Sequence, residues 1–200
     1  MGLPRTGTTS VCAAALSLGF KTAHTAYTKQ TLLDAQFLAD TPIFNDFERL
    51  LLLYPTAKFI YLERDSSTWL PSIKRLLSRM SGRLLAAQGG FFPCLKHAYG
   101  DVFSPLNAST LNDDTHLRRC YLTHQAHVKA FFERIDNPTL VLNLKHKESY
   151  YDFCEFLQRT PKQGFCHLNQ GGKVTAWKQV RHPLKIESTR SGKADPFPFY

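Results

Sequence analysis

The stretch GLPRTGTTS at residues 2–10 combines residue types and a spacing that could hold a phosphate or a sulfate. Gly2 and Gly7 are separated by four residues and two threonines follow, which is the frame of a phosphate-binding loop. Thr8 stands where a nucleotide-hydrolysing loop has lysine, and Arg5 puts a positive charge inside the loop instead. We therefore expect an anion cradle rather than an ATPase loop, although a glycine-rich turn that only caps a helix would have the same composition.

Hydroxyl groups and a helix terminus strengthen the expected cradle. The side chains that could donate to an anion are those of Thr6, Thr8, Thr9 and Ser10. Small and apolar residues follow up to Gly19 and predict a helix over residues 8–20. The positive end of its dipole would point at the loop.

A second candidate anion site lies in YLERDSSTWLPS, residues 61–72. Residues 57–64 read as a buried strand, which places Arg64 at its carboxyl end, and Ser72 follows eight residues later. Ligands of open α/β sheets collect at such strand ends, and a guanidinium there can bind a phosphate through two hydrogen bonds. The alternative is that Arg64 pairs with a surface carboxylate and Ser72 is simply exposed.

Taken together, the two elements resemble the sulfotransferase family. Members carry a P-[KR]-[ST]-G-T-T loop, here PRTGTT at 4–9, and a strand–Arg–x7–Ser–helix element, here Arg64 with Ser72. The segment LLLLYPTAKFIYLERDSSTWLPS is similar to a bacterial and marine-animal branch, and FCEFLQRTPKQGFCHLN at 153–169 resembles the ending of that branch. In all, the resemblance touches residues 2–10, 40–77 and 145–169.

The resemblance implies a donor, 3′-phosphoadenosine 5′-phosphosulfate, whose product is adenosine 3′,5′-bisphosphate. It also implies an α/β fold of the three-layer P-loop NTPase type, with a central parallel sheet flanked by helices in a single domain over residues 1–200. By the family's motifs, the donor's 5′-phosphosulfate would be bound by Arg5, Thr6, Gly7, Thr8, Thr9 and Ser10, and its 3′-phosphate by Arg64 and Ser72. Arg5 would also act in catalysis, because it would supply the positive charge that the missing lysine supplies in other phosphate-binding loops.

A base is expected for the proton that the acceptor loses. Relatives place a His two residues before a Pro, ahead of the 3′-phosphate arginine, and here Asp40 holds that place before Pro42. Asp40 could act in catalysis, cap a helix starting at Pro42, or do both, and His24 is the second candidate. Lys173 in NQGGKVTAW is a possible phosphate contact, and His167 reads as structural. No family tryptophan follows the loop, so the adenine partner is open.

The rest of the chain alternates helices with strands, which favours a parallel sheet. Further helices are expected at 41–55, 65–80, about 117–135 and 148–158, and strands at 57–64 and 139–144. Residues 20–27 are expected to hold a short strand and the loop after it. Asp65 or Ser66 would cap the 65–80 helix. Residues 81–112 are expected to form a long, partly ordered, variable insertion that contributes to the acceptor pocket, and about 185–200 a loose tail. In the family the loop follows a buried strand, but here only Met1 precedes Gly2. We expect one of three explanations: the true start lies upstream, the chain has been shortened, or another segment fills the place of that strand.

Composition and charge indicate which kinds of ligand and partner the protein could bind. The net charge is +9 with eight further histidines, which is typical of a protein that binds an anionic ligand, a nucleic acid or an acidic membrane, and equally of a merely solvated basic surface. No aromatic-interleaved RNA motif is present, so nucleic acid is not expected as a partner. The five cysteines include no C-x-x-C or zinc spacing, so we expect reduced thiols, no metal and a cytoplasmic location. No apolar run approaches the roughly 20 residues of a membrane span.

Three functions are compatible with these patterns. The first is sulfuryl transfer from 3′-phosphoadenosine 5′-phosphosulfate to a small-molecule or glycan acceptor, by in-line displacement. The second is a non-catalytic member of the same fold that binds a nucleotide or a partner. The third is a P-loop small-molecule kinase, against which Thr8 in the lysine position argues.

Overall fold

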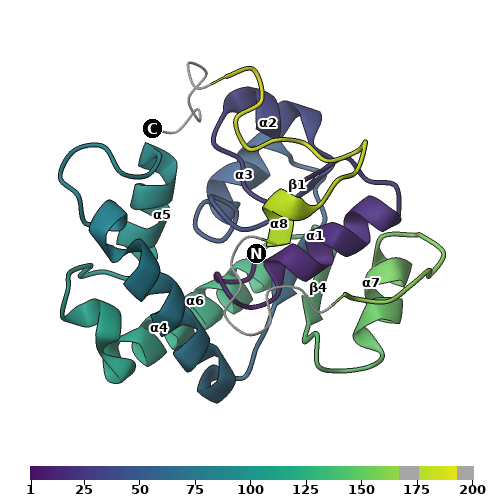
Figure 1. The fold of residues 1–200 in the computed structure, drawn as a ribbon. Helices are drawn as coiled ribbons and strands as arrows, with labels where there is room; N and C mark the ends of the chain where they lie inside the picture. The colour runs from purple at the N-terminus through teal and green to yellow at the C-terminus, as the bar shows by residue number, and fades with distance from the viewer. Residues whose placement is uncertain (167–175, 193–200) are drawn as a thin grey trace.

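The computed structural model describes residues 1–166 and 176–192 (Figure 1). Helices and short parallel strands alternate along the chain, which confirms the α/β class. The helices are α1 Thr8–Ser17, α2 Lys29–Asp34, α3 Phe47–Leu53, α4 Ser66–Leu84, α5 Pro93–Val102, the 3₁₀ helix η1 Thr110–Asn112, α6 Asp114–Arg134, α7 Ser149–Phe156 and α8 Ala176–Gln179. The strands are β1 Thr22–Ala23, β2 Phe37–Leu38, β3 Phe59–Leu62 and β4 Thr139–Leu142.

The strands form two parallel pairs within the described residues, where a single central sheet was expected. β3 pairs with β4 so that Phe59 lies opposite Thr139 and Leu62 opposite Leu142. β1 pairs with β2, and Thr22 also bridges to Lys185. Both β3 and β4 come from the apolar runs expected to be buried strands, because β-branched and aromatic residues pack well on a pleated surface. β3 is largely buried, whereas Val141 of β4 is exposed and only Leu142 of that strand is buried, so the expectation of a buried strand was wrong for most of β4. Arg64 follows β3 by two residues, so β3 carries the second candidate element to the sheet end.

Residues 1–3, with which the loop begins, lie against β3. The Met1 amino group donates to the Ile60 carbonyl at 2.5 Å, and Leu3 is 1% exposed. A Cβ on Gly2 would lie 2.5 Å from the Leu62 Cβ, so only glycine fits this close approach. The loop therefore starts from the end of β3, where Arg64 also lies.

Helix α4 agrees with its sequence pattern. The Asp65 side chain accepts hydrogen bonds from the Ser67 and Thr68 amides, which confirms the expected N-cap. Trp69, Ile73 and Leu77 are fully buried at helical spacing and pack in a cluster with residues of α5 and α6. Figure 1 shows α4 and α5 on the left and α1 and α7 on the right, with the start of the chain between them.

Residues 81–112 are more ordered than the sequence indicated. They hold the end of α4, the whole of α5 and η1, and Leu95, Ala98, Tyr99 and Phe103 are buried at the spacing of a helix. Gly89 and Gly90 lie between α4 and α5, and Pro93 occupies the first turn of α5, whereas Gly82 and Gly100 lie inside these helices. The stretch is part of the main core.

Two further expectations need correction. The helix expected over 41–55 begins only at Phe47, and Thr41 is not its N-cap. Ile43 and Phe44 instead pack into two different core clusters, so tertiary packing outweighs the local helix signal. The supposed capping role of Asp40 for a helix at Pro42 is therefore wrong.

The segment 185–192, expected to be the start of a loose tail, is docked on the body of the protein. The Ile186 amide donates to the Thr22 carbonyl at 2.9 Å, and the Tyr27 amide donates to the Ser188 carbonyl at 2.8 Å. Ile186 is buried. Residues 193–200 lie outside the described part of the chain.

The thiols are free, as expected, and four of the five are buried. Among the described residues, no helix is both long and apolar enough to cross a membrane.

Candidate active site

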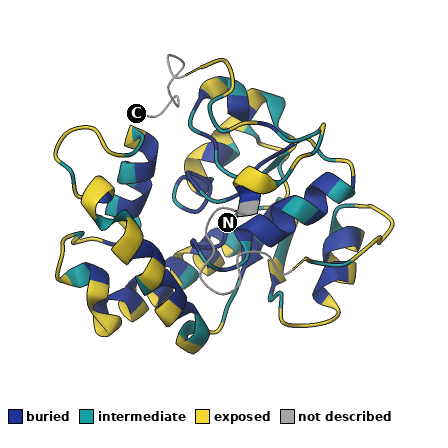
Figure 2. Cartoon of the chain, viewed as in Figure 1, coloured by how far each residue is buried: buried dark blue, intermediate teal, exposed yellow. Residues whose placement is uncertain are grey.

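The loop at residues 2–7 leads directly into α1. Arg5 and Gly7 both have left-handed backbones, with φ of 75° and 112°. The Ser10 and Val11 amides donate to the Gly7 carbonyl at 2.9 and 3.2 Å, so the first turn of α1 closes on the loop. A Cβ on Gly7 would lie 2.8 Å from the Leu144 Cδ2 and would be strained at this φ, so glycine is needed here. The positive end of α1 thus faces the loop, as an anion cradle requires. Figure 2 shows α1 largely buried.

The two candidate anion elements, separate in sequence, are hydrogen-bonded to each other. Arg5 Nε donates to Ser72 Oγ at 2.9 Å, and Arg64 Nη1 donates to the Arg5 carbonyl at 2.6 Å. The Trp69 indole donates to the Pro4 carbonyl at 2.9 Å and fixes the loop on α4. The structure therefore brings Arg5, Arg64 and Ser72 into one site.

Positive charge is concentrated in this site. Burial lowers the pKa of Arg5, and the charges of Arg64, Arg75 and Arg79 lower it further. Burial likewise lowers the pKa of Arg64, with Arg75 as the next cause. The guanidinium groups repel one another, so an anion bound beside them would relieve that repulsion.

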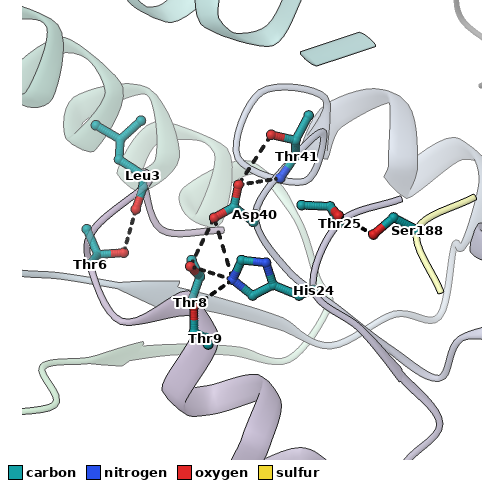
Figure 3. A network of polar contacts seen from close by, with 9 residues as sticks. All are labelled: Leu3, Thr6, Thr8, Thr9, His24, Thr25, Asp40, Thr41 and Ser188. Atoms are coloured by element: carbon teal, nitrogen blue, oxygen red, sulfur yellow. Dashed lines mark hydrogen bonds and ion pairs between the residues drawn. The ribbon is translucent and has the colours of Figure 1, made fainter. Parts of the chain in front are cut away.

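Beside the loop, the hydroxyl groups of Thr8 and Thr9 lie within hydrogen-bond distance of the two candidate bases (Figure 3). Thr8 Oγ1 donates to Asp40 Oδ2 at 3.0 Å and lies 3.2 Å from His24 Nε2. Thr9 Oγ1 lies 3.0 Å from the same nitrogen, which is 3.7 Å from Asp40 Oδ2. Asp40 Oδ1 accepts from the Thr41 amide at 2.9 Å. Both candidate bases thus lie at the start of α1, next to the cradle.

The surroundings of His24 keep its ring neutral. Burial lowers the pKa of His24, and the nearby Asp40 carboxylate only partly opposes this effect. The ring stacks on Trp177 of α8 with centroids 5.5 Å apart. A neutral imidazole can accept a proton, so His24 keeps its place as the second candidate base.

One cavity of about 1460 Å³ is lined by every candidate site residue that the structure describes. Its lining includes Arg5, Thr6, Gly7, Thr8, Thr9, Ser10, His24, Asp40, Arg64 and Ser72. Among the described residues, nine basic side chains and three carboxylates line it. The cavity is large enough for a nucleotide and strongly favours an anion.

Sequence reasoning missed several lining residues. Arg75 and Arg79 continue from Ser72 at helical spacing, so the pattern of α4 could have indicated them. Lys145 follows β4, and its place beside the loop depends on the β3–β4 register. Trp177 ends the segment NQGGKVTAW, in which only Lys173 was singled out as a possible contact. Lys173 and His167 fall outside the described residues.

Similarity to known proteins agrees with this site. Residues 25–174 match a family model described as a sulfotransferase domain. The match contains Asp40, Arg64 and Ser72, and the loop at 2–10 precedes it. No match exists among curated proteins.

Proposed function

The chain belongs to the family of sulfotransferase domains, and on that premise we propose that its donor is 3′-phosphoadenosine 5′-phosphosulfate, with a hydroxyl or amine as acceptor. The observation that carries the proposal is the direct link between the two anion elements through Arg5, Ser72 and Arg64. A donor that carries anions on both its 5′ and 3′ oxygens needs two linked cationic sites. The crowding of guanidinium charge in the cavity fits such a polyanion.

Each element has a proposed role. The 5′-phosphosulfate is bound by Arg5, Thr6, Gly7, Thr8, Thr9 and Ser10, and the 3′-phosphate by Arg64 and Ser72. Asp40 is the base, with His24 as the second candidate. The same proposal includes a single three-layer P-loop NTPase-like domain, catalysis without a metal, no nucleic-acid partner and a cytoplasmic location.

The bound donor supplies the sulfuryl group. Asp40 accepts the acceptor's proton while the acceptor oxygen or nitrogen forms its bond to sulfur and the sulfur bond to the donor's bridging oxygen breaks. Arg5 and the loop amides stabilise the charge that develops on that oxygen, and adenosine 3′,5′-bisphosphate leaves. Because Asp40 lies within hydrogen-bond distance of Thr8 in the cradle, base and cradle are close enough to act on one sulfur.

Thermal unfolding with a panel of nucleotides tests the donor assignment. Adenosine 3′,5′-bisphosphate at 100 times its dissociation constant should stabilise the native state by about 2.7 kcal/mol. For a chain of this size the melting temperature should rise by roughly 5–10 °C. Two control ligands are used at the same concentration: adenosine 5′-phosphate, which lacks the 3′-phosphate, and ATP with magnesium. Both should raise the melting temperature much less. An equal rise with ATP would favour the kinase alternative instead.

A further inference from the structure

Two tyrosines are among the described residues that line the cavity, and their hydroxyl groups differ in what they contact. The Tyr27 hydroxyl has a hydrogen bond with the Thr25 side chain. The Tyr99 hydroxyl has no hydrogen bond with any residue that the structure describes. Tyr99 lies on α5 and is only 3% exposed. A hydroxyl that is buried in this way without a partner in the protein is uncommon, and it indicates that the partner comes from elsewhere.

The hydroxyl of Tyr99 opens into the cavity. Among the described residues, the one fully enclosed side-chain nitrogen or oxygen without a hydrogen bond is His124 Nδ1. The Tyr99 oxygen also lacks a hydrogen bond, so it is not fully enclosed, and the small exposed part of this residue includes it. Because Tyr99 is part of the cavity lining, a ligand in the cavity can reach this oxygen.

Aromatic packing fixes the position of Tyr99 near the proposed base. Its ring contacts the Phe44 ring edge-on, with centroids 5.7 Å apart, and the Phe103 ring at 5.6 Å. The Phe44 amide in turn donates to the Asp40 carbonyl at 3.0 Å. Figure 1 shows α5, which carries Tyr99, and α1, whose first turn forms the cradle, on opposite sides of the start of the chain. Phe44 therefore connects the open hydroxyl with the base on the cradle side.

The surroundings of Tyr99 keep its hydroxyl protonated. Burial raises the pKa of Tyr99 well above its ordinary value, and Asp40 and Tyr27 raise it further, while Arg5 lowers it. The hydroxyl therefore keeps its proton at neutral pH and does not act as the base. It can donate one hydrogen bond and accept others, whereas an ionised carboxylate such as Asp40 only accepts. The two residues thus offer complementary contacts to one reacting group.

We propose that Tyr99 binds the reacting hydroxyl or amine of the acceptor and holds it in line with the sulfur. This inference rests on the proposed sulfuryl transfer. A hydroxyl acceptor gives its proton to Asp40, attacks sulfur with one lone pair and accepts from Tyr99 with the other. An amine acceptor attacks with its single lone pair and gives one proton to Asp40, while another of its N–H groups donates to the Tyr99 oxygen. The nucleophile is then already ordered before the transition state, which favours the reaction.

Tyr99→Phe tests this proposal, because it removes the hydroxyl and keeps the ring. The full chain is incubated with sulfur-labelled 3′-phosphoadenosine 5′-phosphosulfate and with phenol, benzyl alcohol, benzylamine or N-acetylglucosamine. Labelled product is counted together with labelled sulfate, which reports transfer to water. Tyr54→Phe is the matched control, since the Tyr54 hydroxyl donates to the Leu32 carbonyl and Tyr54 is not among the described cavity residues. Calorimetry measures the affinity of each variant for adenosine 3′,5′-bisphosphate, and melting curves measure its stability.

Tyr99→Phe should lower kcat/KM about tenfold for each acceptor that wild type converts, and by the same factor between about pH 6 and pH 8. Its bisphosphate dissociation constant should stay within about twofold of wild type, and its melting temperature within about 2 °C. Tyr54→Phe should keep the kcat/KM of wild type.

Equal kcat/KM in Tyr99→Phe and wild type would overturn the role of Tyr99 and leave the sulfuryl transfer intact. A clearly lower melting temperature of Tyr99→Phe would also overturn it, because the hydroxyl would then have a partner inside the protein. A pH profile of kcat/KM that changes its shape in Tyr99→Phe would contradict a role limited to binding. The absence of any labelled product with wild type would instead refute the sulfuryl transfer, and the role of Tyr99 with it.

Discussion

Replacing Arg64 with alanine is expected to raise the dissociation constant for adenosine 3′,5′-bisphosphate about 100-fold. The substitution removes a charge-assisted contact to the proposed 3′-phosphate, and such a contact contributes about 1.5–3 kcal/mol. It also removes the bond from Arg64 Nη1 to the Arg5 carbonyl, which holds the loop in place. Isothermal titration calorimetry measures the effect directly.

The backbone contacts of Arg64 with Tyr121 do not depend on its side chain, so the variant should fold. Arg118→Ala is the matched control, because Arg118 is exposed, contacts Ser66 and is not among the described cavity residues. Its dissociation constant should stay within about twofold of wild type. An unchanged dissociation constant for adenosine 3′,5′-bisphosphate in Arg64→Ala would show that Arg64 does not bind the donor.

Replacing Asp40 with asparagine is expected to lower kcat by about 10²–10⁴-fold and to leave donor affinity nearly unchanged. Asparagine keeps the shape, and its one carbonyl oxygen can still accept from the Thr41 amide while its NH₂ group donates to the Thr8 hydroxyl, but it cannot take up the acceptor proton. The rate is measured as adenosine 3′,5′-bisphosphate formed from the donor with a panel of hydroxyl and amine acceptors.

His24→Gln is the informative comparison for Asp40→Asn. Glutamine can keep a hydrogen bond to the hydroxyls of Thr8 and Thr9, so a purely structural role of His24 should be largely preserved. The account predicts a clearly smaller loss of kcat in His24→Gln than in Asp40→Asn. A larger loss of kcat in His24→Gln than in Asp40→Asn would show that the His24 imidazole, and not Asp40, is the base.

The two candidate anion elements could be located from the sequence because their signals are local. The glycines and hydroxyls of residues 2–10 act on one turn of backbone, and Arg64 with Ser72 spans a strand end and the helix that follows. The Asp65 cap of α4 is equally local. The α/β class followed from alternating periodicities in the same way.

The parts that could not be predicted depend on contacts between distant segments. The bond from Arg5 to Ser72 joins residues 67 positions apart and exists because Trp69 anchors the loop on α4. The late start of α3 results from the packing of Ile43 and Phe44 into separate clusters, which no short window contains. In α5 the helical spacing was present, but Gly89, Gly90 and Pro93 were given more weight than it.

We propose that this chain transfers a sulfuryl group from 3′-phosphoadenosine 5′-phosphosulfate within the cavity at the start of α1. The most direct measurement follows sulfur-labelled donor in the presence of the acceptor panel and without magnesium. Labelled acceptor and an equal amount of adenosine 3′,5′-bisphosphate should form with wild type, and neither should form with Arg5→Met. Tight donor binding without any conversion would contradict it and identify a non-catalytic binding protein, and magnesium-dependent consumption of ATP would identify a kinase.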